Sequence, residues 1–179
     1  MLTLSLAVAA VVLAMLYNSL VRTRLRVKEA WAAVEVQLQR RASLIPNLVE
    51  IVKGYASHEH ATLAQVVDAR GALNAAAGPR AAASANDDLS GALGRLFALA
   101  EAYPDLKADT QFDRLHADLA DTENKIAYAR NYYNGAVEIY NTRVQTIPGL
   151  LVAGFLRFQA AEFFRADAAA RQAVAARLS

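Results

Sequence analysis

Apolar positions follow two patterns along the chain, and the first is an uninterrupted run. Residues 1–21 carry no charged side chain, and as a helix this segment would be about 31 Å long, close to the roughly 30 Å hydrocarbon thickness of a bilayer. A secretory signal peptide would need a charged start and small residues at a cleavage site, but Tyr17, Asn18 and Ser19 follow the run. We therefore predict an uncleaved transmembrane anchor over residues 1–21, with Tyr17 at the membrane interface.

The second pattern has helical spacing. Apolar side chains recur at alternating steps of three and four residues as far as Tyr55, which predicts a long helix that leaves the membrane as a stiff stem. Arg24 and Arg41 interrupt the stripe and either reach solvent from its edge or make buried polar contacts. The edge is the favoured interpretation. Pro46 should kink this helix, or end it and start another, because proline lacks an N–H group and clashes with the preceding turn. A kink is favoured.

Three more helices follow in the pattern. Periodicity continues to Leu73, fails over residues 75–88, which we interpret as a loop, and returns in a shorter helix that ends at Pro104. Thr110 and Asp113 resemble a capping box, and a heptad-like rhythm typical of coiled coils then predicts a long helix to Ile147. The remainder after Pro148 and Gly149, which includes the aromatic residues up to Phe164 and an Ala- and Arg-rich end, predicts a final helix whose aromatic side packs on the bundle or rests on a membrane surface. Packing is favoured.

Helices of this length with short connections predict an all-α fold. The N-terminal transmembrane helix continues into the long kinked helix of an antiparallel four-helix bundle, with crossing angles of roughly 20°. The expected domains are an anchor at 1–21 and a helical bundle at 22–179.

Charge refines this picture. The formal net charge is +2, but basic residues cluster directly after the anchor at Arg22, Arg24, Arg26 and Lys28. Such a cluster contacts anionic lipid headgroups, and the positive-inside rule places the N-terminus outside and the bundle in the cytoplasm. No basic face with groove-reading side chains follows, so nucleic acid is not an expected partner.

Candidate chemistry is sparse. The chain has no cysteine, which excludes disulfides, thiolate metal sites and a cysteine nucleophile. His58, Glu59 and His60 do not form an HExxH motif, because Thr62 stands where the second histidine would be needed. We expect no catalytic site, cofactor or metal, and a hydrolase that uses these three residues is the minor alternative. Asparagines at seven-residue spacing on the long helix form either a solvated face or a polar seam: Asn124 and Asn131, and Asn134 and Asn141.

Several motifs resemble the LemA family over nearly the whole chain. They include Ala30-Trp31, Arg40-Arg41, the run at 44–50 (Leu-Ile-Pro-Asn-Leu-Val-Glu) and the run at 102–108 (Ala-Tyr-Pro-Asp-Leu-Lys-Ala). The chain departs from the family at Glu35 and Ser43, where aspartate is usual. The resemblance implies a single-pass protein of the bacterial inner membrane with a cytoplasmic four-helix bundle. It supplies no enzymatic activity and suggests a scaffold in envelope organisation.

The sequence therefore favours two functions. The leading hypothesis is a membrane-anchored, non-enzymatic scaffold or adaptor that contacts the lipid bilayer and forms a homo-oligomer through its long helices. The alternative is an accessory or regulatory subunit of a membrane protease or transporter, with residues 44–55 as the docking segment. The candidate interaction residues in that segment are Asn47, Glu50, Lys53 and Tyr55.

Overall fold

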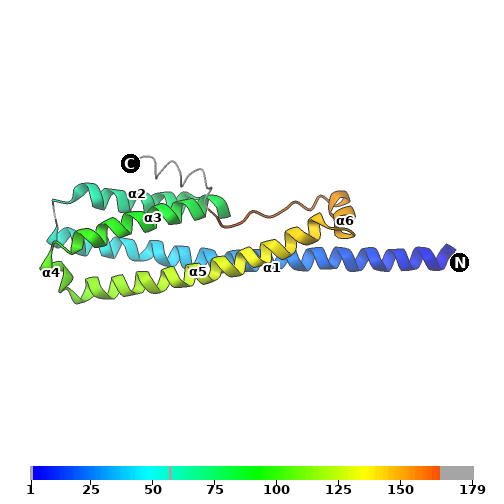
Figure 1. Ribbon diagram of the computed structural model, residues 1–179, viewed down its shortest axis with the longest axis horizontal. Helices are drawn as coiled ribbons and strands as arrows, with labels where there is room; N and C mark the ends of the chain where they lie inside the picture. Colours follow the sequence, from blue (N-terminus) through cyan, green and yellow to red (C-terminus); the bar gives the residue numbers. More distant parts are fainter. Residues whose placement is uncertain (1, 57, 166–179) are drawn as a thin grey trace. The chain divides into compact units, whose positions relative to one another are not determined.

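Helices account for the regular structure of the chain. The computed structural model describes residues 2–56 and 58–165, in which the chain forms α1 (Leu2–Tyr55), α2 (His60–Ala75), α3 (Pro79–Ala100), α4 (Pro104–Lys107), α5 (Thr110–Gln145) and α6 (Gly149–Phe155) (Figure 1). No strand occurs in these two ranges. The predicted all-α class is confirmed.

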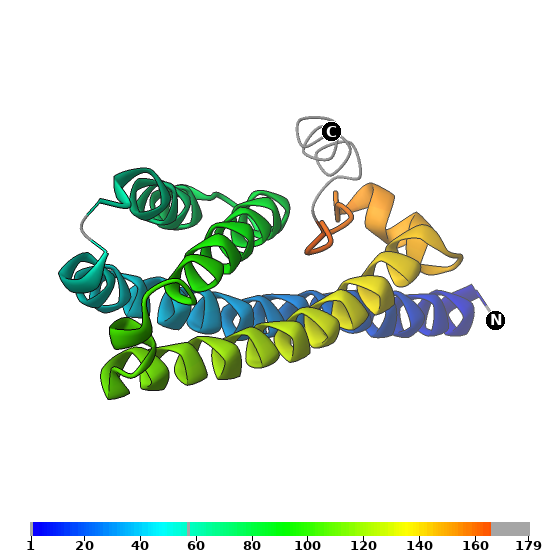
Figure 2. The ribbon, with the colours of Figure 1, turned by 60° about the vertical axis from the view of Figure 1, so that its left-hand side comes forward.

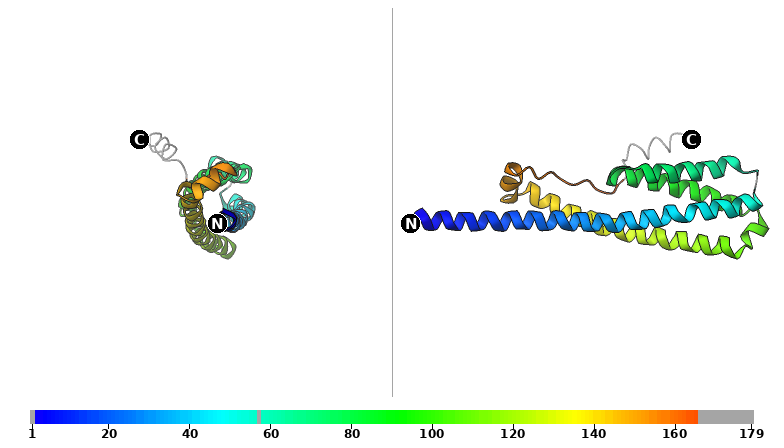
Figure 3. Two further views of the ribbon diagram at one scale, coloured as in Figure 1. Left: turned by 90° about the vertical axis from the view of Figure 1, so that its right-hand side faces the viewer. Right: turned by 180° about the vertical axis from the view of Figure 1, so that it is seen from behind.

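α1 is one helix of 54 residues that contains Pro46 (Figure 3). Pro46 is exposed and removes one intrahelical hydrogen bond, but Ile45 and Leu48 beside it are fully buried, and this packing stabilises the helix on both sides of the proline. The predicted continuation of the apolar segment into a long helix is confirmed. The alternative of two helices that meet at Pro46 is wrong.

Packing divides the chain into two units, which are described separately. Among the described residues, unit 1 contains 2–33 and 129–163, and unit 2 contains 34–56, 58–128, 164 and 165. The predicted division into an anchor at 1–21 and a bundle at 22–179 is defined by where the chain leaves the membrane. The two packing units do not test it. It stays a prediction.

Unit 2 builds its core from residues 34–55 of α1, from α2, from α3 and from residues 110–128 of α5 (Figure 2). The Arg70 Nε atom of α2 donates a hydrogen bond to the Ala42 carbonyl oxygen of α1 at 2.9 Å. The Phe97 ring of α3 meets the Phe112 ring of α5 edge-on, with centroids 6.0 Å apart. These contacts join α1 to α2 and α3 to α5, while the antiparallel four-helix bundle stays a prediction. The core includes the fully buried side chains of Ile45, Leu48, Val66, Leu89 and Leu96.

The predicted loop over residues 75–88 is wrong, because α3 begins at Pro79. Gly78 has a φ of 85° that favours glycine, and proline suits the first helical position because its missing N–H is not needed there. The alanines that follow have high helix propensity, and Ala82, Ala83 and Ala85 are buried. The hydrophobic pattern missed the first half of this helix because the side chains buried there are small.

Asp109 caps α5 in place of the predicted Thr110 box. One carboxylate oxygen of Asp109 accepts hydrogen bonds from the backbone N–H groups of Gln111 at 2.7 Å and Phe112 at 3.0 Å. Thr110 already lies inside the helix. The predicted length of this helix agrees closely with the structure, because α5 ends at Gln145, two residues before Ile147.

The predicted final helix is too long over the described residues, because α6 ends at Phe155. The part of that prediction after residue 165 lies outside the described residues. Arg157 has a φ of 55°, outside the helical range. At the start of α6, a Cβ atom on Gly149 would lie 2.1 Å from the Arg143 carbonyl oxygen, so only glycine permits this close approach.

Side chains of α5 hold the non-helical segment at 159–162, which we call the strap. Tyr140 donates a hydrogen bond to the Gln159 carbonyl at 2.8 Å, and Tyr133 donates to the Glu162 carbonyl at 2.7 Å. The Asn141 amide pairs with both backbone groups of Ala161, at 2.9 and 2.8 Å. These bonds replace those that a helix would supply. Asn141 therefore lies in a polar seam within the chain, while Asn124 and Asn131 are exposed.

Candidate functional site

The N-terminal part of α1 exposes apolar side chains that a soluble helix would bury. Leu4, Leu6 and Met15 are 67%, 75% and 66% exposed. An 18-residue window of this helix has a mean hydropathy of 2.1, and 6% of that window is buried in the protein. α1 is long and apolar enough to cross a membrane, and its low burial distinguishes it from the core helix of a soluble protein. This segment is a candidate membrane span.

The predicted membrane-surface residues form two basic edges after this span. Arg22, Arg24, Arg26 and Lys28 are all exposed. At about 100° per helical residue, Arg22 and Arg26 lie near one another, and Arg24 and Lys28 lie near one another on the other side. The side chains of the buried face, including Thr23, lie between the two pairs. Each edge can therefore meet a different neighbour in unit 1.

Arg143 of α5 joins the first edge. Its Nη1 atom donates a hydrogen bond to the Ser19 hydroxyl. Arg22, Arg26 and Arg143 line one hollow of about 390 Å³. Arg143 was not among the residues predicted from the sequence, because α5 meets α1 only through tertiary packing.

Phe158 joins the second edge. The Tyr17 ring meets it edge-on, with centroids 6.2 Å apart, and the Arg24 guanidinium lies 5.8 Å from its centroid, within range of a cation–π contact. Tyr17 and Arg24 are thus brought together by a residue that was predicted only as part of a final helix. Lys28 is exposed farther along α1.

Residues 147–156 present a second exposed apolar surface in unit 1. Ile147, Leu151 and Phe155 are 77%, 70% and 88% exposed. Phe164, by contrast, is 2% exposed. The predicted single aromatic side is therefore divided: Phe164 is buried, whereas Phe155 of α6 is exposed.

The exposed face of α5 in unit 1 carries a further hollow. Tyr132 and Ile139 are each 51% exposed and stand seven residues apart, with Gly135 and Ala136 between them. Together with residues of α1 they line a hollow of about 400 Å³. The buried face of the same helix contains Tyr133, whose ring packs on Trp31 with centroids 5.3 Å apart. Burial raises the pKa of Tyr133 to about 12.

The predicted interaction residues at 47–55 divide into two groups in unit 2. Asn47 and Glu50 are exposed and line a hollow of about 510 Å³. Lys53 is exposed but does not line it. Tyr55 donates a hydrogen bond to the Asp109 carboxylate at 2.9 Å, and this bond raises the pKa of Tyr55. The other walls of the hollow are Ile51 of α1 and Gln111, Arg114 and Leu115 of α5.

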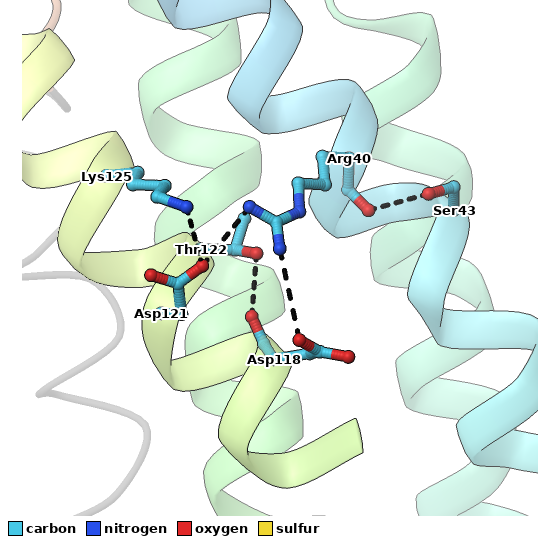
Figure 4. Close-up of polar contacts among 6 residues, drawn as sticks. All are labelled: Arg40, Ser43, Asp118, Asp121, Thr122 and Lys125. Carbon is cyan, nitrogen blue, oxygen red and sulfur yellow. Dashed lines mark hydrogen bonds and ion pairs between the residues drawn. The ribbon is translucent and has the colours of Figure 1, made fainter. Parts of the chain in front are cut away.

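Arg40 and Arg41 connect α1 to its neighbours in unit 2. Figure 4 shows Arg40 between Asp118 at 3.9 Å and Asp121 at 3.1 Å. Asp121 also pairs with Lys125 at 2.8 Å, and Lys125 and then Arg40 lower the pKa of that carboxyl group.

Arg41 is buried, so the favoured position at the edge of the stripe is wrong for this residue. Its Nη1 atom lies 2.7 Å from a Glu123 carboxylate oxygen and donates to Asn86 Oδ1 at 2.5 Å. Burial lowers the pKa of the Arg41 guanidinium, and the Glu123 charge opposes that shift. Ser43, where the family usually has aspartate, donates a local hydrogen bond to the Arg40 carbonyl at 2.7 Å (Figure 4).

The side chains of His58, Glu59 and His60 do not point to a common site. His58 and His60 are exposed, and the Glu59 carboxylate accepts a hydrogen bond from the Tyr103 hydroxyl at 3.1 Å. Among the residues that the structure describes, no three histidine, aspartate or glutamate side chains are placed to hold a metal ion.

Comparisons with known proteins identify similar proteins over most of the chain. The model of the LemA family matches residues 30–177. Magnetosome protein MamQ 2 of Paramagnetospirillum magneticum is 27% identical over 86% of this chain and 66% of the relative. Magnetosome protein MamQ of Magnetospirillum gryphiswaldense is 26% identical, with 90% of this chain and 69% of the relative covered. Protein LemA of Metamycoplasma hominis is 26% identical, with 84% and 72% covered. The chain thus spans 66% of the length of the first of these relatives, just under two thirds.

Proposed function

This chain belongs to the LemA family, and from that premise we propose that it is a membrane-anchored, non-enzymatic scaffold that self-associates through the exposed face of α5 in unit 1. The exposed apolar part of α1 supports the membrane anchor. The relatives carry the names of magnetosome and LemA proteins rather than of enzymes, which supports a role without catalysis.

One observation carries self-association: the face of α5 that includes Tyr132, Gly135, Ala136 and Ile139. Soluble helices expose isolated apolar residues often, but here two large side chains at heptad spacing flank two small residues in one hollow. Helices associate when large side chains enter the spaces that small residues leave on the facing helix. The face has both parts of such a contact.

A second copy of this chain is the occupant that fits. In a two-fold pair the same surface must be complementary to itself, and this face presents both the large side chains and the space for them. Anchoring in a membrane also confines the copies to one surface, which raises their effective concentration. We therefore assign the face to a homo-oligomer rather than to an unrelated helix.

Cysteine cross-linking tests the assignment directly, because the chain has no native cysteine. Gly135→Cys is suitable, since an added Cβ meets no atom within 4 Å. Arg130→Cys, exposed and about 140° around the same helix, is the matched control. Under mild oxidation of full-length protein in membranes, Gly135→Cys should form dimers and Arg130→Cys should not. In neutral detergent, light scattering should give a dimer or larger for the parent and a monomer for Tyr132→Asp. Equal cross-linking of the two variants, or a strictly monomeric parent, would sink the proposal.

The proposed location is the bacterial inner membrane, with the N-terminus outside and the remaining chain in the cytoplasm. The basic residues after the apolar segment support it, because positively charged flanks stay on the cytoplasmic side. A membrane-impermeant thiol reagent should label Arg130→Cys only after the inner membrane is opened. Labelling of intact cells whose outer membrane alone is permeable would reverse the orientation.

The second candidate function is an accessory or regulatory subunit of a membrane protease or transporter. The hollow with Asn47 and Glu50 favours it, because that hollow combines a carboxylate, the Arg114 guanidinium and two side-chain amides with the apolar Ile51 and Leu115. Such a lining suits a polar peptide segment whose own amides and charges need partners.

Substitution of the two α1 residues separates this candidate from the scaffold. Asn47→Ala with Glu50→Ala should remove one defined membrane protein from the cross-linked products while helicity and self-association are kept. Lys53→Ala, exposed on the same helix but outside the hollow, is the control. Identical cross-linked partners in both variants and the parent would exclude this surface.

A further inference from the structure

The hollow beside the end of the apolar segment contains an excess of positive charge. Three guanidinium groups line it, and none of its lining residues is acidic. Arginine stays protonated in proteins, so Arg22, Arg26 and Arg143 repel one another unless an anion lies between them. The planar guanidinium group donates paired hydrogen bonds that match the oxygens of a phosphate. The hollow therefore suits a phosphate group.

The hollow also changes from apolar to basic along α1. Met15 lines one end and is 66% exposed, whereas Arg26 lines the other. These residues are about 16 Å apart along the helix axis. Asn18 and Ser19, which carry neutral polar groups, lie between them. A phospholipid has the same order of groups, with acyl chains, then ester and glycerol oxygens, then phosphate.

The level of this hollow in the membrane follows from its neighbours in unit 1. The apolar part of α1 precedes it directly. α6 lies beside the same part of α1 (Figure 1, Figure 2), where the Phe158 ring meets Tyr17. α6 exposes Leu151 and Phe155, which are stable at the boundary between acyl chains and headgroups. Both surfaces place the three arginines where lipid phosphates lie.

We propose that Arg22, Arg26 and Arg143 bind the phosphate of an anionic phospholipid, with the acyl chains directed toward Met15. The site rests on the proposed function only in its membrane anchor and does not require self-association. Two basic residues come from α1 and one from α5, so bound lipid stabilises the contact between these helices in unit 1. The ligand class is a phosphodiester headgroup such as phosphatidylglycerol.

Native mass spectrometry of the full-length protein in neutral detergent tests this site. The probes are phosphatidylglycerol, phosphatidylcholine and inorganic phosphate, each added separately. The parent should retain phosphatidylglycerol at least tenfold more tightly than phosphatidylcholine. Arg22→Gln with Arg143→Gln should lose this preference by about tenfold, whereas Lys53→Gln with Arg130→Gln, which removes the same charge from exposed positions outside the hollow, should keep it.

The double variant Arg22→Lys with Arg143→Lys keeps the charge. It therefore controls for loss of binding that is caused by misfolding. It should bind with intermediate affinity, because lysine lacks the paired donors. Equal retention of the two lipids by the parent, equal loss in the control pair, or binding of inorganic phosphate without a preference between the lipids would overturn the lipid site. The same spectra report dimer and monomer masses, so failure of self-association is distinguished from failure of lipid binding.

Discussion

The ion pair between Arg41 and Glu123 provides a sharp test of how unit 2 tolerates a buried charge. The Arg41 side chain is 5% exposed and that of Glu123 is 46% exposed. Removal of one partner from a fully buried ion pair costs about 3–5 kcal/mol. Water can reach Glu123, and Asn86 still accepts a hydrogen bond from Arg41 after Glu123 is removed. We therefore expect Glu123→Ala to lower the free energy of unfolding of unit 2 by roughly 2 kcal/mol.

The reverse substitution should cost less. Arg41→Met removes the charge, leaves a half-exposed Glu123 that water can solvate, and takes one donor from Asn86, so we expect a loss of about 1 kcal/mol. Once Arg41 is absent, removal of Glu123 causes no further loss in the free energy of unfolding. The double variant should therefore match Arg41→Met and be about 1 kcal/mol more stable than Glu123→Ala.

Hydrogen exchange followed by mass spectrometry measures these differences in the full-length protein. Because 1.4 kcal/mol is a factor of ten, Glu123→Ala should speed exchange of the buried amides of α1 and α3 around Arg41 and Asn86 by roughly 30-fold. Asp118→Ala is the control, since Asp118 is 53% exposed and 3.9 Å from Arg40; such surface pairs change exchange by about threefold or less. Additive losses in the double variant, or equal exchange in Glu123→Ala and Asp118→Ala, would refute the reasoning.

Two pH-dependent predictions follow from the hydrogen bonds of α5. Burial holds the Tyr133 pKa at about 12 in the folded chain. The contribution of Tyr133 to the free energy of unfolding is therefore present below the ordinary pKa of about 10. That contribution is lost as the pH rises from about 10 to about 12. Tyr133→Phe should remove this alkaline loss of protection in the strap and, at neutral pH, cost about 1 kcal/mol through the lost bond to Glu162. The pKa of Asp109 is lowered, first by the Phe112 N–H group and then by Tyr55. The contribution of Asp109 to the free energy of unfolding is therefore present above its ordinary pKa, and it is lost as the pH falls through the pKa of the folded chain. Asp109→Asn keeps a capping oxygen and should flatten the loss of helicity in circular dichroism as the pH falls below about 4. An unchanged acid profile would contradict the assigned cap.

Local patterns were sufficient wherever a helix has large apolar side chains at regular spacing. They predicted α1 as one long helix and α5 from Thr110 to near its end, since large apolar side chains recur at helical spacing along both helices. They failed at the start of α3, where alanines fill the core, and after α6. There the backbone of the strap is stabilised by Tyr133, Tyr140 and Asn141, which no pattern within residues 156–164 could indicate.

The candidate sites divide in the same way. The apolar segment, the basic residues after it, and Asn47 and Glu50 were predicted from the chain alone, because hydropathy, charge and the family motifs are properties of consecutive residues. Arg143, Phe158 and the burial of Arg41 depended on which helices meet.

A long, apolar N-terminal helix, an all-α fold and membership of the LemA family could all be predicted from the amino-acid sequence. Contacts between helices were needed to show that Arg143 lines one hollow with Arg22 and Arg26. They also showed that Asn47 and Glu50 line a hollow with α5, and that Tyr132 and Ile139 are exposed. The physical reason is distance along the chain: helix formation depends on neighbours three and four residues away, whereas these sites join side chains from helices that are remote in sequence and close in space.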